Sequence, residues 1–143
     1  EDYGYAAFID QVDTMIVGRK TYDKVKSMGI EYPPAGKQLF VVTRSPRPAS
    51  GPVTFYTGGL TTPVQQPRSL PGKHIYCDGG AEIVNELLKH NLVDELIISV
   101  IPFLAGNGTK LFSSGRPQQK LILVSARQFE KGLVQLHYKC DGL

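Results

Sequence analysis

The chain has 143 residues, a length that predicts one domain with a single hydrophobic core. Its hydrophobic fraction of 41% and charged fraction of 20% exclude a disordered chain and a fibrous repeat. The basic residues exceed the acidic ones by only three and are dispersed along the chain, which argues against nucleic-acid binding. No apolar run approaches the ~20 residues of a membrane-spanning helix.

The two cysteines, Cys77 and Cys140, lack the spacing of a metal or redox motif, and no secretory leader opens the sequence. We therefore expect a cytoplasmic protein without a metal site.

The first half of the chain predicts helices and strands in alternation. Apolar residues recur at helical spacing and then give way to short apolar runs that end at glycine or proline. The expected elements are a helix from Tyr5 to Val12, a strand at residues 14–17, a helix from Arg19 to Met28, strands at residues 39–43 and 53–56, and an irregular or shortened helix at residues 61–70.

The second half continues with a strand at residues 74–77, an amphipathic helix at residues 81–90 and a strand at residues 95–101. Residues 121–128 and 133–139 predict a hairpin around Glu130-Lys131-Gly132. This order predicts an α/β fold of three layers, with a mostly parallel central sheet, helices on both faces and a carboxyl-terminal antiparallel hairpin.

The strand ending at Val17 is followed by Gly18, Arg19, Lys20 and Thr21. A glycine lets the backbone approach a ligand, and the first N–H groups of the next helix point toward it. Two cations at a helix N-terminus oppose the helix dipole, so a bound phosphate explains them better than solvation does. The alternative is a tight turn with solvated cations.

Two further strand ends have a similar composition. Gly79 and Gly80, followed by Ala81 and Glu82, leave the N–H groups of the next helix unobstructed, although one such turn alone is a weak signal. Thr43-Arg44-Ser45 adds hydroxyls and a cation, with a plain polar loop as an equal alternative. Together the three turns suit an extended nucleotide with several phosphates, and NADP(H) fits better than NAD(H).

Three segments carry a family resemblance: residues 12–22, residues 79–88, and residues 93–108 with their Gly-Asn-Gly turn. They resemble the dihydrofolate reductase-like superfamily, and within it the reductase domain of the bacterial bifunctional riboflavin-biosynthesis deaminase-reductase and its stand-alone relatives. The similarity runs from Tyr5 to Lys139.

The resemblance implies a single NADPH-binding reductase domain over residues 1–143, which forms a homodimer. It implies a phosphate-binding turn at residues 18–21, a contact with the adenosine phosphate at residues 43–45, and a pyrophosphate loop from Gly79 to Ile83 with a cis Gly79–Gly80 bond. The family's opening strand and loop are absent from this sequence. Substrate-side residues therefore cannot be transferred.

The expected activity is reduction of a small heterocycle, either a pyrimidine ribosylamine or a pteridine. No catalytic residue can be assigned from the sequence. Ile101, Pro102 and Leu104, after a strand, are weak candidates for a wall of the substrate pocket. A dihydrofolate reductase and a non-catalytic nucleotide-binding module remain the alternatives.

Overall fold

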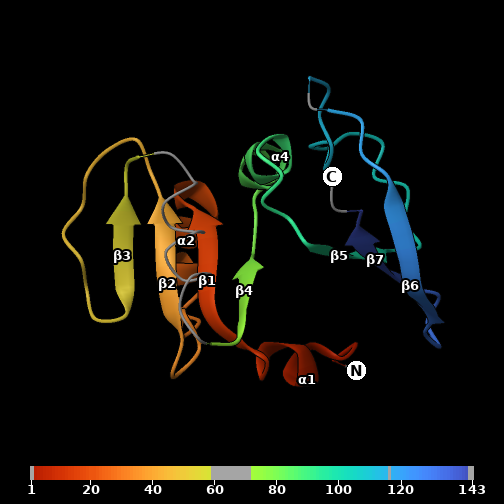
Figure 1. Ribbon diagram of the computed structural model, residues 1–143. Helices are drawn as coiled ribbons and strands as arrows, with labels where there is room; N and C mark the ends of the chain where they lie inside the picture. The colour runs from red at the N-terminus through yellow and green to blue at the C-terminus, as the bar shows by residue number, and fades with distance from the viewer. Residues whose placement is uncertain (1, 59–71, 116, 142–143) are drawn as a thin grey trace.

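A parallel sheet with a helix on each face is followed by a separate antiparallel sheet (Figure 1). The computed structural model describes residues 2–58, 72–115 and 117–141. In chain order the elements are α1 (Tyr5–Ile9), β1 (Val12–Gly18), α2 (Arg19–Ser27), β2 (Gln38–Val42), β3 (Val53–Tyr56), β4 (His74–Cys77), α4 (Ala81–Lys89), β5 (Glu95–Val100), β6 (Leu121–Gln128) and β7 (Val134–Cys140).

The parallel sheet has the strand order β3-β2-β1-β4. Ile16 of β1 is level with Phe40 of β2 on one side and with Cys77 of β4 on the other. β1 is therefore flanked on both sides, and four consecutive residues, from Thr14 to Val17, are buried, as expected for an inner strand covered on both faces.

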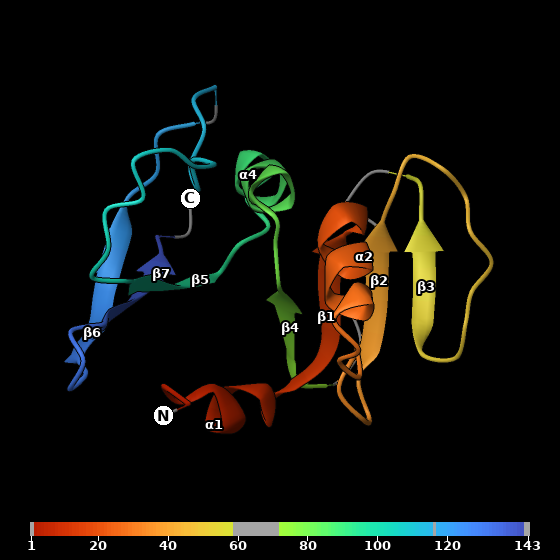
Figure 2. The ribbon, with the colours of Figure 1, turned by 180° about the vertical axis from the view of Figure 1, so that it is seen from behind.

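Alternate residues of β1 enter two hydrophobic clusters on opposite faces of the sheet. Met15 and Val17 pack with Tyr22 of α2 and with Leu39 of β2. Ile16, between them, packs with Leu87 of α4. α2 and α4 thus cover opposite faces, which confirms the predicted three layers. Figure 2 shows α2 against β1 and β2 from behind.

The antiparallel sheet has the strand order β5-β7-β6. Its register separates two faces. A mainly apolar face consists of Leu96, Ile98, Val100, Leu121, Leu123, Ala126, Val134, Leu136 and Tyr138, with Gln128 and Cys140 level with Val134 and Leu121. A mainly polar face consists of Glu95, Ile97, Ser99, Ile122, Ser125, Arg127, Gln135, His137 and Lys139.

The predicted hairpin is confirmed, but it forms a sheet with β5 instead of extending one central sheet. β4 is an edge strand of the parallel sheet and β5 is an edge strand of the antiparallel sheet. Among the described residues, no strand pairing joins the two sheets.

The first helix is shorter than its apolar spacing predicts, because Val12 belongs to β1 and is completely buried there. The Asp2 carboxylate accepts hydrogen bonds from the N–H groups of Gly4, at 2.9 Å, and Ala6, at 3.2 Å, which stabilises the start of α1. The expected helix at residues 61–70 lies outside the described residues. Among the helices that are described, none has the length and apolar character of a membrane span.

Candidate functional site

Three turns meet at the carboxyl edge of the parallel sheet. In the register, Gly18 at the end of β1 is level with Val42 at the end of β2. Cys77, at the end of β4, is level with Ile16. The structure therefore brings together the three segments that the sequence predicts as one site, with the turn at residues 18–21 in the middle.

The two glycine turns are in direct contact. The Gly18 N–H donates a hydrogen bond to the Gly79 carbonyl oxygen at 2.8 Å. The Gly79–Gly80 peptide is cis, as predicted, and Gly79 has a φ of +97°. A Cβ atom added to Gly18 would lie 3.3 Å from Ile83 Cγ1, so α4 approaches this turn closely.

The N-termini of α2 and α4 open onto these turns. Gly18 and Gly80 are the N-cap residues, and neither helix has a side-chain hydrogen bond at its cap. The first-turn N–H groups of a helix have no partners within the helix, and together with the helix dipole they favour an anion. Thr21 of α2 reaches the other turn, since a Cβ on Gly80 would lie 3.6 Å from its hydroxyl. The N-termini of α2 and α4 thus converge on one place.

The cations of the site are not equivalent. The Arg19 guanidinium lies 3.3 Å from the carboxylate of Asp23, one helical turn further along α2. Lys20 and Arg44 are exposed. The sequence assigned Arg19 to a phosphate directly, whereas the structure pairs it with an acid that no turn motif had indicated.

The third turn is shaped by its own side chain. Thr43 is buried, and its N–H donates to the Tyr56 carbonyl at 3.0 Å. Its hydroxyl accepts a hydrogen bond from the Ser45 N–H at 3.2 Å. Thr43 therefore holds the turn, while Arg44 and Ser45 are exposed at its tip.

An acid with two tyrosine partners stands directly before Gly79. Tyr32 donates a hydrogen bond to Asp78 Oδ2 at 2.7 Å, and Tyr76 donates one to Asp78 Oδ1 at 2.9 Å. Burial is the first cause that raises the pKa of both tyrosines, and the Asp78 carboxylate adds to it. Both phenols are thereby held as neutral donors. Sequence analysis missed this cluster, since Tyr32 carries no signal that links it to Asp78.

A cavity of about 480 Å³ lies between α1, β4 and the mainly polar face of the antiparallel sheet. One wall of the cavity is aromatic and includes Tyr3, Tyr5, Phe8 and Tyr76. The opposite wall supplies hydrogen-bonding groups and includes Ser99, Arg127 and His137. On the second wall the His137 imidazole lies 2.8 Å from the Glu95 carboxylate. Tyr76 connects this cavity to the glycine turns through Asp78.

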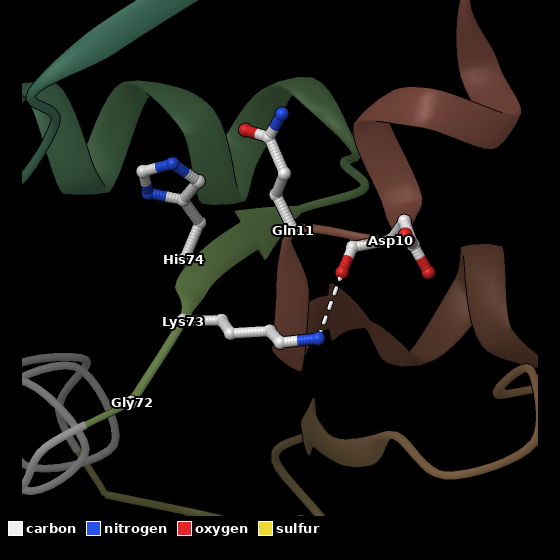
Figure 3. A pocket seen from close by; sticks show the side chains of 5 residues that line it. All are labelled: Asp10, Gln11, Gly72, Lys73 and His74. Atoms are coloured by element: carbon white, nitrogen blue, oxygen red, sulfur yellow. Dashed lines mark hydrogen bonds between the residues drawn. The ribbon is translucent and has the colours of Figure 1, made fainter.

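A smaller hollow of about 340 Å³ lies at the amino ends of β1 and β4, opposite the three turns (Figure 3). Lys73 Nζ there donates to the Asp10 carbonyl oxygen at 3.0 Å. Neither hollow is lined by a residue of the three turns.

The residues predicted for a substrate wall lie apart from both hollows. Ile101 is 65% exposed and Leu104 is 96% exposed. Pro102 lies beside the hairpin turn, where a Cβ on Gly132 would be 3.4 Å from its Cγ. Their role in substrate binding stays a prediction.

Solved structures share this fold. A putative riboflavin biosynthesis protein from Shewanella sp. PV-4 matches with a TM-score of 0.88 and 25% identity, over 99% of this chain and 81% of that one. A pyrimidine reductase-like protein from Corynebacterium diphtheriae matches with a TM-score of 0.70 and 17% identity, over 92% of this chain and 77% of that one. Acinetobacter baumannii RibD matches with a TM-score of 0.68 and 16% identity, over 91% of this chain and 47% of that one.

Two Bacillus subtilis proteins of uncharacterised function are similar in sequence. YwjB is 39% identical over 138 residues, which are 96% of this chain and 79% of YwjB. YyaP is 29% identical over 152 residues, covering 99% of this chain and 81% of YyaP. The model of the RibD C-terminal domain family matches residues 6–135. The chain therefore belongs to the RibD C-terminal domain family, within the dihydrofolate reductase-like fold.

Proposed function

We propose that the protein is a reductase that uses NADPH to reduce a small heterocyclic substrate. The observation that carries this proposal is the convergence of two helix N-termini without side-chain caps on the contact between Gly18 and Gly79. Membership of a reductase-like family, with a riboflavin biosynthesis protein among the similar structures, supports it.

The residues present fit NADPH. The N–H groups at the starts of α2 and α4, with the Thr21 hydroxyl between them, suit a pyrophosphate. Arg44 and Ser45 at the tip of the neighbouring turn suit the phosphate on the adenosine ribose, with Lys20 adding positive charge. NADPH supplies the hydride when bound; the chain supplies binding and orientation.

For the substrate we propose a pyrimidine ribosylamine or a pteridine, held in the cavity beside α1. Its aromatic wall suits a planar ring, and Arg127 and His137 on the opposite wall suit polar or phosphate groups of the substrate. The first choice is a ribosylamino-pyrimidine phosphate of the kind reduced in riboflavin biosynthesis.

Titration of the protein with NADPH, followed by nicotinamide fluorescence, tests the cofactor. NADPH oxidation is then measured with 5-amino-6-(5-phosphoribosylamino)uracil and with dihydrofolate. Turnover of the uracil compound is expected. Turnover of dihydrofolate that methotrexate inhibits would instead identify a dihydrofolate reductase. Binding without turnover across a metabolite panel would favour a non-catalytic module, and no NADPH binding would reject the proposal.

We also propose that the protein forms a homodimer through the apolar face of the antiparallel sheet. Val100 is 50% exposed and Leu123 is 56% exposed on this face. No helix has an extensive contact with these strands among the described residues. A second copy would remove this apolar area from water.

A cytoplasmic location, which we also propose, is tested by cell fractionation.

A further inference from the structure

The turn that carries Arg44 and Ser45 is tied to α2 by a second ion pair. The two terminal nitrogens of Arg47 lie 2.9 Å and 3.0 Å from the two carboxylate oxygens of Asp23. This is the bidentate geometry in which an arginine and a carboxylate fix each other's orientation. Hydrogen bonding from Arg47 is the largest cause that lowers the pKa of Asp23, so Asp23 is ionised at neutral pH.

Arg47 is also held from a second side. Its guanidinium carbon lies 5.3 Å from the centre of the Phe55 ring, within the range of a cation–π interaction. Phe55 in turn packs edge-to-face on Tyr22 of α2, with ring centres 5.5 Å apart. The segment after β2 is therefore connected to α2 directly, by the ion pair, and indirectly, through the contacts from Arg47 to Phe55 and from Phe55 to Tyr22.

Asp23 also accepts a hydrogen bond from Arg19 at 3.3 Å. One carboxylate thus engages two of the cations near the strand ends, at the first turn of α2 and in the loop after β2. Lys20 and Arg44 take no part in the contacts of Asp23 and are exposed. Of the four cations, Arg19 and Arg47 are thus paired with Asp23, and of these two only Arg47 joins the loop to α2, while Lys20 and Arg44 face solvent.

We propose that Asp23 is a positioning residue that sets the preference of the site for a phosphorylated ribose. By holding Arg47 it keeps the segment from Thr43 to Arg47 against α2, and so keeps Arg44 and Ser45 near the end of β2, which is level with Gly18 at the start of α2. The ligand class is a nucleotide with a monophosphate on the adenosine ribose, such as NADPH. This inference rests on the proposed cofactor and names what selects it over NADH.

Two physical effects of Asp23 have opposite signs, which makes the proposal testable. A carboxylate near a phosphate site repels the phosphate, so removal of its charge alone would strengthen NADPH binding. If Asp23 positions the loop, its removal weakens NADPH binding, because Arg44 and Ser45 lose their fixed place. NADH lacks the ribose phosphate and is expected to respond little.

The experiment measures dissociation constants for NADPH and NADH with the wild type, Asp23→Asn, Arg47→Ala and the double variant. We expect the NADPH constant to rise about tenfold in each single variant, as for loss of one hydrogen bond to a charged group, and the NADH constant to change less than about twofold. Because the two residues act as one unit, the double variant should be no weaker than either single one.

Arg47→Lys and Glu31→Gln complete the set. Lysine keeps the positive charge but cannot form two parallel hydrogen bonds to a carboxylate. Arg47→Lys should therefore lose the preference for NADPH over NADH, as Arg47→Ala does. Glu31 is an exposed acid just beyond α2, and its replacement is the matched control for removal of one negative charge. Thermal unfolding checks that each variant is folded.

The constants are measured at one low ionic strength, because the Arg47 and Asp23 side chains are 37% and 39% exposed and salt weakens their ion pair. An unchanged or stronger preference for NADPH in Asp23→Asn, or a preference retained in Arg47→Lys, would overturn this inference and leave the proposed function in place. A wild-type protein that binds no NADPH would reject the proposed function, and this inference with it.

Discussion

The hydroxyl of Tyr32 lies 2.7 Å from Oδ2 of Asp78, a residue 46 positions further along the chain. Tyr32 follows α2, whereas Asp78 follows β4 and immediately precedes the cis Gly79–Gly80 bond. This hydrogen bond joins the segment after α2 to the glycine turn. Tyr76 binds the other carboxylate oxygen, so the acid is held from two sides.

Replacement of Tyr32 by phenylalanine should therefore destabilise the protein. The ring of Tyr32 is buried, and phenylalanine keeps its packing while it removes a hydrogen bond to a carboxylate. Loss of such a bond is expected to lower the free energy of unfolding by about 1–3 kcal/mol. Urea unfolding followed by circular dichroism measures the change.

Tyr5→Phe is the control for this variant, since the Tyr5 side chain is 48% exposed and no hydrogen bond of its hydroxyl is found among the described residues. We expect its unfolding free energy to stay within about 0.5 kcal/mol of the wild type, as for surface substitutions. Equal losses in Tyr32→Phe and Tyr5→Phe would contradict the role of the Asp78 contact.

The same cluster predicts how stability depends on alkaline pH. The native pKa values of Tyr32 and Tyr76 are raised, first by burial and then by the neighbouring carboxylate, above the value of about 10 in the unfolded chain. Below pH ~10 both states carry neutral phenols, so the contribution to stability is fully present. As the pH rises above ~10, the unfolded chain ionises more readily than the native one, and stability is lost.

Unfolding free energies measured in urea from pH 8 to pH 11 check this dependence. The wild type should lose stability above pH 10, and a Tyr32→Phe/Tyr76→Phe double variant should lose less of it over the same interval. Parallel pH profiles for the two proteins would show that these tyrosines are not responsible.

The close approach of α4 to Gly18 predicts an effect of a side chain at this position on cofactor binding. In Gly18→Ala the new Cβ would meet Ile83 Cγ1 at 3.3 Å, so the Ile83 side chain in the first turn of α4 must shift by a few tenths of an ångström. Such a shift disturbs the start of α4, whose N–H groups are proposed to bind the pyrophosphate, so we expect NADPH affinity to fall by about two- to fivefold, a loss of less than about 1 kcal/mol. Fluorescence titration of NADPH measures it.

Gly108→Ala is the matched substitution, because a Cβ at Gly108 meets nothing within 4 Å. Its NADPH affinity and melting temperature should equal those of the wild type. Wild-type affinity in Gly18→Ala would mean that the close approach of α4 to Gly18 is unimportant for the cofactor.

Much of this fold could be predicted from local patterns. The alternation of β1, α2 and β2 and the hairpin of β6 and β7 follow from apolar spacing and from glycine and proline positions. Val12 was assigned to the wrong element because its spacing suits a helix, while its burial in β1 depends on neighbouring strands. The separation of the two sheets depends on which edges pair, and periodicity carries no information about that.

The site was predictable where its groups belong to the backbone. Glycines at strand ends indicate exposed N–H groups, and the structure brings these turns together. The side-chain pairs were not predictable: Asp23 and Arg47 are 24 residues apart, and Tyr32 and Asp78 are 46 apart. Each residue alone suits an exposed position equally well, so only the folded chain shows which partners meet.

The proposed homodimer predicts a difference between two neighbouring residues of β6. Leu123 shares the apolar face with Leu96 and Tyr138, while Ile122 lies on the opposite face, level with Lys139 and Glu95. Both side chains are about equally exposed, at 56% for Leu123 and 50% for Ile122. Leu123→Lys would bury a charge in the dimer interface, whereas Ile122→Lys would place the same charge outside it.

We therefore expect the wild type and Ile122→Lys to be dimers in light scattering at micromolar concentration, and Leu123→Lys to be a monomer. An unpaired charge in an interface costs several kcal/mol, and since each ~1.4 kcal/mol is a factor of ten, a micromolar dimer would dissociate. A monomeric wild type would refute the dimer. Dissociation by Ile122→Lys alone would place the interface on the face of the sheet that lines the cavity, where a second copy would obstruct the proposed substrate site.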